Sequence, residues 1–338
     1  MGTGPAATRP ATVAVVGVGA VGATLAGLLA AAGHPVLACS PHRPADDALV
    51  LESPAGRSTH PVRWAATAGE VDRTVDWVVV ATKIPQTAAA GPWLAALSGP
   101  ATRVLVAQNG VDQTVRFAAL TDRPVVPALV YLQAERTGVG HVHFRRTARD
   151  LVVPDDPAGR AAKALFAGTP LTVELAPDFR TAAWEKLLRN SAANPIPALT
   201  DRRMDVFADA EVMSLARDVL TETAAVARAE GARLPGDAVE AAMDWLRSLH
   251  PDAVTSMLQD RRAGRQTEID GLLGTTVTLA ARHGLTVPTT RSLRALLRAA
   301  ERPSPADAGT CAPAARLAPA PRRPDDRPGA RGASGRPA

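Results

Sequence analysis

The hydrophobic positions in the first half of the chain form short continuous runs, which is the pattern of strands buried on both faces. These runs occupy residues 12–16, 36–39, 77–81, 104–107 and 125–132. Stretches with helical spacing or turn residues, such as 25–32 and 88–97, lie between them. Because strands that alternate with helices form a parallel sheet, this half predicts a doubly wound α/β domain.

The pattern changes near residue 180, where strand-like runs stop and helical spacing takes over. The stretches with this spacing are 183–193, 211–230, 237–249, 253–262, 267–283 and 290–300. The second half is therefore expected to be all helical. We place the α/β domain at 11–180 and the helical domain at 181–301.

Composition and charge matter mainly at the C-terminus. The chain has 338 residues and a net charge of +5, and residues 302–338 hold seven arginines, three aspartates and eight prolines. That segment has too little apolar surface to fold, so it is predicted to be disordered, as is 1–10. Because most of the excess charge lies there, the folded part is nearly neutral, and no nucleic-acid partner is expected.

The remaining global features narrow the class of protein further. Cys39 and Cys311 are far apart, so neither a disulfide framework nor a thiolate metal site is expected, and no metal is assigned. No apolar run is long enough to span a membrane, and residues 1–10 lack the pattern of a signal peptide. We expect a cytoplasmic location and no membrane partner.

A glycine-rich turn follows the first predicted strand and opens the first predicted helix. Gly17 is expected to permit the tight turn, Gly19 the close approach of a pyrophosphate, and Gly22 the packing of helix on strand. In this context the motif predicts a dinucleotide site made by Gly17, Val18, Gly19, Ala20, Val21 and Gly22.

The end of the second predicted strand indicates which dinucleotide binds. An acidic side chain there would hold the ribose hydroxyls of NAD, but residues 38–43 contain no carboxylate. Arg43, helped by Ser40 or His42, is instead suited to a 2′-phosphate. NADP is therefore favoured over NAD.

Lysine is rare in this chain. Of 38 basic residues only three are lysines, Lys83, Lys163 and Lys186. Arginine stays protonated, whereas lysine can exchange its proton in suitable surroundings, so a reaction that moves a proton needs lysine.

Asparagine is equally rare, and two of the three asparagines follow Lys186 at helical spacing. Lys186, Asn190 and Asn194 lie four residues apart, so on a helix they share one face. An ammonium and two carboxamides suit the binding and protonation of an oxo acid. Pro195 is expected to place Asn194 at a helix end beside a turn.

Taken together, these motifs resemble the ketopantoate reductase family from about residue 12 to residue 300. Besides the glycine turn, the chain carries Ala81-Thr82-Lys83 with Gln86, Gln108-Asn109-Gly110, the helix 184–194 (WEKLLRNSAAN), 255–260 (TSMLQD) and 267–270 (TEID). The resemblance implies a Rossmann domain followed by a helical domain of the 6-phosphogluconate dehydrogenase-like type. It also implies a helical domain that binds substrate and forms a possible homodimer.

The resemblance further implies roles for individual residues. Lys186 corresponds to the proton donor, and the substrate contacts correspond to Asn109, Asn190, Asn194 and Ser256. The cofactor contacts implied beyond the glycine turn and Arg43 are Lys83, Asn109, Ala134 and Glu268. The implied reaction is reduction of 2-dehydropantoate (ketopantoate) to pantoate by NADPH, a step toward coenzyme A, with Lys186 as general acid.

One departure from the family pattern leaves alternatives open. Members often carry another substrate-binding asparagine where this chain has Met204. A reductase of a different small 2-oxo acid, with the same lysine, is therefore an alternative. A non-catalytic NADP-binding sensor or scaffold is a second, although it leaves the stripe containing Lys186 unexplained. The seven histidines suggest no lactate or malate dehydrogenase type of site.

Overall fold

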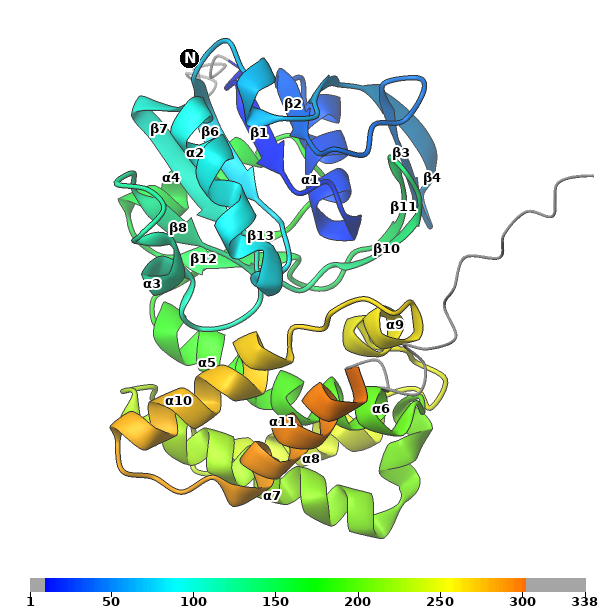
Figure 1. The fold of residues 1–338 in the computed structure, drawn as a ribbon, viewed down its shortest axis with the longest axis vertical. Coiled ribbons are helices and arrows are strands. Elements are labelled where there is room, and N and C mark those ends of the chain that lie inside the picture. Colours follow the sequence, from blue (N-terminus) through cyan, green and yellow to red (C-terminus); the bar gives the residue numbers. More distant parts are fainter. Residues whose placement is uncertain (1–9, 302–338) are drawn as a thin grey trace, which may run out of the picture. The chain divides into compact units, whose positions relative to one another are not determined.

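The computed structural model describes residues 10–301. The tail 302–338 with Cys311, and all of the predicted disordered N-terminus except Pro10, lie outside the described residues. Within 10–301, every strand lies before Phe179, and all regular structure from that residue onward is helical (Figure 1).

A six-stranded sheet, parallel throughout, forms the centre of the first half. Its order is β5 (Arg63–Ala65), β2 (Val36–Cys39), β1 (Val13–Val16), β6 (Val75–Val80), β7 (Ser98–Val106) and β8 (Val125–Pro127). Alternate side chains of β1 face opposite layers. Val13 and Val15 pack with α1 (Ala20–Ala31), whereas Ala14 and Val16 pack with α2 (Gly91–Leu97) and α3 (Gln113–Phe117). The prediction of a doubly wound sheet is confirmed.

Two smaller sheets, which the hydrophobic pattern did not predict, flank the central one. One has the order β10 (Gln133–Gly138), β11 (His141–Arg145), β3 (Ala48–Ser53) and β4 (Gly56–Pro61). The other has the order β13 (Val173–Ala176), β12 (Leu151–Pro154) and β9 (Leu129–Val130), with α4 (Pro157–Leu165) against it. The single strand predicted at 125–132 is wrong, because β8 pairs with β7 while β9 pairs with β12.

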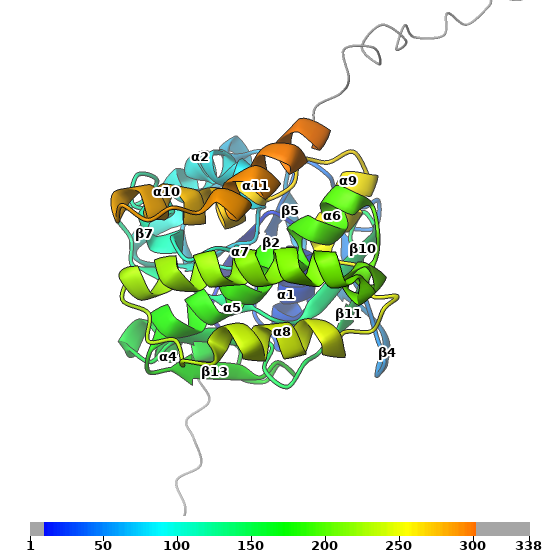
Figure 2. The same cartoon turned by 90° about the horizontal axis from the view of Figure 1, so that it is seen from below.

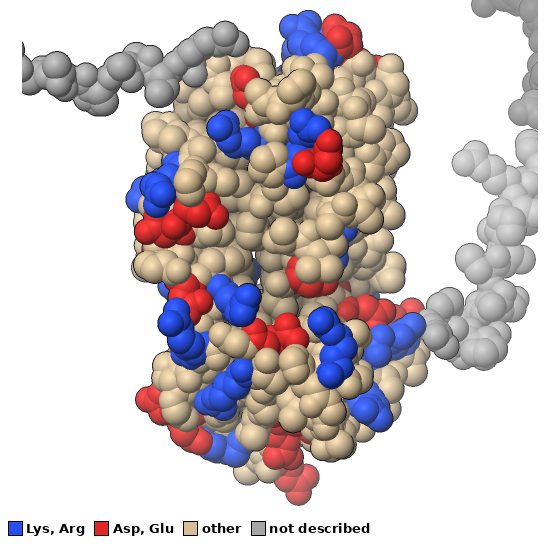
Figure 3. All heavy atoms as spheres, turned by 90° about the vertical axis from the view of Figure 1, so that its left-hand side faces the viewer, with Lys and Arg blue, Asp and Glu red and all other residues tan. Residues whose placement is uncertain are grey.

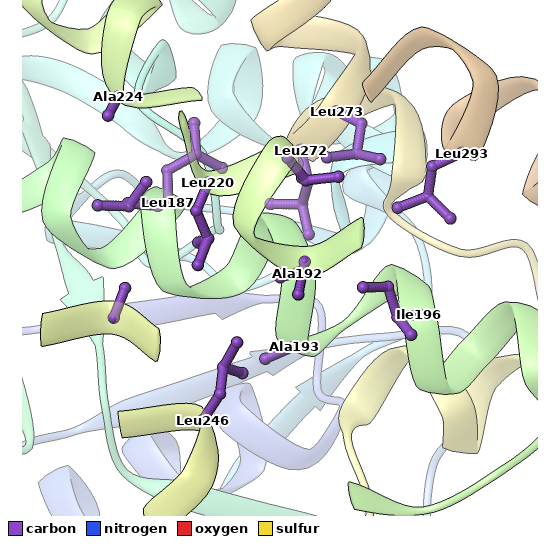
Figure 4. Close-up of a cluster of buried hydrophobic side chains, with 14 of the residues drawn as sticks. Leu187, Ala192, Ala193, Ile196, Leu220, Ala224, Leu246, Leu272, Leu273 and Leu293 are labelled. Carbon is purple, nitrogen blue, oxygen red and sulfur yellow. The ribbon is translucent and has the colours of Figure 1, made fainter. Parts of the chain in front are cut away.

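The second half is a set of packed helices. Figure 2 shows α5 (Phe179–Ala193), α7 (Ala210–Ala229) and α8 (Ala238–Ser248) lying side by side. The others are α6 (Pro195–Thr200), α9 (Ser256–Arg262), α10 (Thr275–Arg282) and α11 (Pro288–Glu301). Leu187, Leu220, Leu246 and other buried side chains from these helices meet in one core (Figure 4).

The junction of α5 and α6 confirms part of the expectation: Asn194 does end a helix, but its backbone is not turned away from helical geometry. Asn194 is the only residue between the two helices, and its backbone is itself right-handed helical (φ −90°, ψ −52°). A proline is tolerated in the first turn of a helix, because its missing N–H would have had no partner there. Asn194 therefore ends one helix and begins the next without an intervening loop.

Short helical turns complete the chain. They are η1 (Ala68–Glu70), η2 (Ile84–Ala90), η3 (Met204–Ala208) and the π-helical turn η4 (Asp270–Gly274). The η4 turn leads directly into α10, inside the stretch predicted as one helix at 267–283. Single π turns of this kind are frequent at functional sites.

Candidate active site

The glycine turn between β1 and α1 has the steric features expected from its sequence. Gly17 has φ +91°, and a Cβ there would lie 2.6 Å from the Thr82 nitrogen. A Cβ on Gly22 would lie 2.0 Å from the Gly17 carbonyl oxygen. At Gly19, by contrast, a Cβ would meet nothing within 4 Å. The chain thus leaves space beside Gly19 while closing it at the other two glycines.

The same turn leaves the N-terminus of α1 suited to an anion. Gly19 is the N-cap residue and offers no side chain to the first N–H groups, and the first turn has no acidic residue. Val18, Ala20 and Val21 add no charged group. Free N–H groups and the positive end of the helix dipole favour a phosphate. The residues present therefore fit a dinucleotide pyrophosphate.

Arg43 lies beyond the end of β2, where its charge is accessible. Its side chain is 56% exposed and forms an ion pair with Asp47, which raises the pKa of the guanidinium further. Ser40 is buried, and its hydroxyl accepts a hydrogen bond from the His42 N–H at 3.1 Å. Arg43 is thus a charged group that can exchange an exposed partner, Asp47, for a phosphate.

Lys186 of α5 reaches the ends of two strands of the first half. Its Nζ donates to the Asn109 Oδ1 at 3.1 Å and to the Val130 carbonyl at 2.6 Å. Asn109 follows β7, and Val130 is the last residue of β9. One amine from the helical half is thereby fixed at the carboxyl edge of the central sheet, the edge at which doubly wound folds bind ligands.

The surroundings of Lys186 favour its neutral form. Burial lowers the pKa of Lys186 to about 8, although the negative charge of Glu268 acts in the opposite direction. Removing an ammonium from water costs free energy, which is the cause of the shift. A lysine with this pKa can release and regain a proton near neutral pH.

Glu268 connects Lys186 to the loop after β6. Its Oε2 accepts from the Asn109 Nδ2 at 2.8 Å, and its Oε1 accepts from the Ile84 N–H at 3.0 Å. Glu268 is buried and precedes the η4 turn by two residues. These bonds form one chain of contacts, from Lys186 through Asn109 and Glu268 to Ile84.

The same loop carries Lys83, which makes a second contact with the helical half. Lys83 forms an ion pair with Asp260 of α9, whose side chain is only 4% exposed and which also pairs with Arg265 at 2.9 Å. A Cβ on Gly271 would lie 2.3 Å from the Ile84 Cδ1, so a glycine is needed there for the loop to approach. We call the Lys83–Asp260 pair and the Ile84–Glu268 bond the interdomain clasp.

The structure does not bring every predicted residue into this network. Asn190 on α5 and Asn194 at the C-terminal end of that helix are partly buried, and within residues 10–301 their carboxamides have no hydrogen-bond partner. Ser256 is exposed at the start of α9. Ala134 lies in β10, opposite Phe144 of β11. Met204 is an apolar side chain buried in the helical core, so this position offers no polar group to a substrate.

Sequence reasoning missed three residues of the site. Asp260 is the last residue of the 255–260 (TSMLQD) motif, but the family resemblance did not imply a role for it. Arg116 is largely buried and donates to the Asn109 carbonyl at 2.7 Å, and burial lowers the pKa of its guanidinium. Tyr131 lies with its ring centre 5.2 Å from the Lys186 Nζ. Only Tyr131 had a usable signal, because it is the single tyrosine of the chain.

Other features of the described residues bear on partners. Within 10–301, no three His, Cys, Asp or Glu side chains are grouped so that they could hold a metal ion. No helix in that range is long and apolar enough to cross a membrane. Basic and acidic side chains are interspersed on the face shown in Figure 3. A hollow lined by residues that include Val111, Phe179 and Trp184 contains none of the predicted site residues.

A parallel sheet with an open glycine turn, followed by a helical half that supplies a part-buried lysine, defines the class of Rossmann-type, NAD(P)-dependent oxidoreductases. The family model described as "Ketopantoate reductase PanE/ApbA" matches residues 13–156, and that of its C-terminal part matches residues 178–301. The chain belongs to the ketopantoate reductase family.

Similarity to individual proteins supports the same family assignment. A 2-dehydropantoate 2-reductase of Caulobacter vibrioides is 39% identical over 291 residues, which cover 86% of this chain and 99% of that protein. The solved ketopantoate reductase from Ralstonia eutropha JMP134 superposes with a TM-score of 0.79 at 34% identity, covering 86% and 98% of the two chains. A dimeric ketopantoate reductase from Staphylococcus aureus superposes with a TM-score of 0.77 at 26% identity, covering 86% and 98%.

Proposed function

We propose that this protein reduces 2-dehydropantoate to pantoate with NADPH, using Lys186 as the general acid. The observation that carries the proposal is the chain of contacts from Lys186 through Asn109 to Glu268 at the carboxyl edge of the sheet. The names of the relatives support the substrate. The pathway assignment, a step toward coenzyme A, remains a prediction that follows from the same proposal, and the cytoplasmic location remains a prediction made from the sequence.

The cofactor would be held mainly by backbone and by one arginine. The turn from Gly17 to Gly22 would take the pyrophosphate and Arg43 the 2′-phosphate, while Lys83, Asn109, Ala134 and Glu268 would contact the nicotinamide half. When bound, NADPH supplies the hydride that the carbonyl carbon of the substrate accepts. Lys83 and Glu268 are already paired in the interdomain clasp. To contact NADPH, each would have to share its partner there or exchange that partner for the cofactor.

Lys186 performs the proton transfer in this proposal. Its ammonium donates a hydrogen bond to the carbonyl oxygen and then gives that oxygen a proton, so that the substrate becomes an alcohol and the lysine becomes neutral. Asn109 and the Val130 carbonyl hold the amine in place during this step. The lysine then regains a proton from solvent, which a pKa of about 8 allows near neutral pH.

Carboxamides and a hydroxyl would bind the oxo acid. Asn190 lies on the same helix as Lys186 and Asn194 at the end of that helix, and their carboxamides have no other partner within residues 10–301. Ser256, at the first turn of α9, would be the third contact. These groups offer hydrogen-bond donors and acceptors for a carboxylate and its neighbouring oxygens.

Consumption of NADPH by purified protein, with a panel of ketopantoate, pyruvate and oxaloacetate and with NADH as control, tests the proposal. Ketopantoate with NADPH is expected to give the highest kcat/KM. A higher value for another acid would favour the alternative reductase, which Met204 supports because it offers no amide to the hydroxyl end of the substrate. No consumption with any acid would favour a sensor or scaffold.

A homodimer built on the helical half remains a prediction. The S. aureus relative is dimeric by its description, which supports the prediction without placing an interface on this chain. Sedimentation of the purified protein at micromolar concentration would give the oligomeric state directly.

A further inference from the structure

Tyr131 has a position that the proposed reaction does not explain. It follows Val130, the residue whose carbonyl accepts the hydrogen bond from Lys186. The centre of its ring is 5.2 Å from the Lys186 Nζ. The end of β9 therefore contacts the same amine twice, once through a backbone oxygen and once through an aromatic ring.

The ring of Tyr131 is itself held in place. The Tyr131 N–H donates to the Asp150 carbonyl at 2.8 Å, which fixes the backbone against the start of β12. The Arg149 guanidinium lies 4.8 Å from the ring centre, and Arg149 also pairs with Glu174 at 3.5 Å. A partly buried side chain with these neighbours has little freedom to turn away from Lys186.

An aromatic face attracts a cation, because the π-electrons give the face a partial negative charge. Lys186 is in a position where burial disfavours its charge, and only Glu268 is a full negative charge acting on it. The other charged groups near the ring are Arg149 and Glu174 on the β12–β13 side and Glu185 and Arg189 on α5. Their signs are mixed, so the ring face is the specific attraction that β9 contributes.

We propose that Tyr131 is a positioning residue, whose ring face holds the protonated amine of Lys186 against the end of β9. This proposal rests on the function proposed above, in which that amine is the proton donor. The ring, and not the hydroxyl, is the active part. Phenylalanine should therefore replace tyrosine at this position, whereas an aliphatic side chain of similar size should not.

Direct titration of Lys186 tests the proposal without any turnover. Because the chain has three lysines, protein labelled with carbon-13 at lysine Cε should give three resolvable signals, with exposed Lys163 as the internal reference. In Tyr131→Leu we expect the pKa of Lys186 to fall by about 0.5 to 1 unit, the size of a partly desolvated cation–π contact. In Tyr131→Phe it should stay at the wild-type value.

Kinetics supply the second readout. In Tyr131→Leu, the pH at which kcat/KM falls on the alkaline side should decrease by the same amount, about 0.5 to 1 unit, with KM for NADPH unchanged. Tyr131→Phe should keep the wild-type pH profile. An unmoved Lys186 signal in Tyr131→Leu, or an equal shift in Tyr131→Phe, would overturn the proposal. Tyr131→Met replaces the leucine variant if that variant does not fold. Wild-type protein that reduces no oxo acid would contradict the proposed function alone.

Discussion

Lys186 combines an unfavourable environment for charge with three groups that hold the amine in place. Burial lowers its pKa to about 8, while Asn109, Val130 and the Tyr131 ring fix the position of the Nζ. A general acid must be protonated to act and must be able to release its proton, and its efficiency is greatest when its pKa lies near the working pH. The geometry of Lys186 meets these conditions.

The first prediction is the pH dependence of the reaction. Below about pH 8 Lys186 is protonated and can donate, and above that pH it becomes neutral, so kcat/KM should fall as the pH rises through about 8. An ordinary exposed lysine would give this decrease near pH 10.4. Initial rates between pH 6 and about 10 measure it, and a flat profile across pH 8 would mean that another group supplies the proton.

Arg43 carries the second prediction at the residue scale. Replacing Arg43 with alanine should raise KM for NADPH by about tenfold, because the variant loses the charge-assisted hydrogen bond to the 2′-phosphate. KM for NADH should change little, since NADH has no 2′-phosphate. Arg57→Ala is the matched control, because Arg57 is an exposed arginine of β4 that pairs with Glu52 of β3. Equal losses for both cofactors would remove Arg43 from this role.

Part of the site could be predicted from sequence, because rare residues stood out. Lys186, Asn190 and Asn194 could be placed on one helix face by their spacing alone. The contact of Lys186 with the Val130 carbonyl could not be predicted, since a backbone carbonyl has no sequence signal and β9 is only two residues long. Arg116 was one arginine among many, and only the fold shows that it is buried under the Asn109 loop.

At the scale of elements, the turn between β1 and α1 contributes both to stability and to cofactor binding. Substitutions at two of its glycines distinguish these contributions. Gly22→Ala should destabilise the protein by about 2 kcal/mol or more, because its Cβ would meet the Gly17 carbonyl oxygen at 2.0 Å. Gly19→Ala should leave the free energy of unfolding unchanged, because nothing lies within 4 Å. It should still weaken NADPH binding about tenfold, since the pyrophosphate needs that space.

Chemical denaturation and a fluorescence titration with NADPH measure the two effects. Gly236→Ala is the matched control, because a Cβ there also meets nothing within 4 Å, and it should change neither quantity. If Gly19→Ala bound NADPH as tightly as wild type, the pyrophosphate would not lie over this turn.

The strands of the central sheet were predictable where a whole hydrophobic run belongs to one strand. The central strands β1, β2, β6 and β7 were found for that reason. The run at 125–132 failed, because its two halves pair with strands of different sheets. Strand β4 of the hairpin β3–β4 was missed, since it is largely exposed and has no apolar run. Short exposed strands depend on their partners, which a local pattern does not contain.

At the scale of the whole described molecule, the site exists only where the two halves meet. Lys186 comes from α5, Asn109 from the loop after β7, and Glu268 from the segment before α10. The interdomain clasp holds the loop after β6 against the helical half. Breaking the clasp should therefore affect stability as well as cofactor binding.

Asp260→Asn tests the clasp. Asp260 is 4% exposed and pairs with Lys83 and Arg265, so loss of its charge should lower the free energy of unfolding by about 1–3 kcal/mol, less than for a fully buried pair because both cations are part-exposed. Asp244→Asn, in an exposed pair with Arg247, is the control and should cost less than about 0.5 kcal/mol. Equal effects of the two variants would show that the clasp contributes no more than a surface pair.

The most direct test of the account compares Lys186→Ala with Lys163→Ala, which removes an exposed lysine of α4. For each variant, turnover of ketopantoate with NADPH and the Kd for NADPH are measured together. Lys186→Ala should lose about 10²- to 10⁴-fold in kcat, the usual contribution of a general acid, with Kd nearly unchanged, and Lys163→Ala should match wild type. A Lys186→Ala enzyme that turns over at the wild-type rate would contradict the assignment of the proton donor.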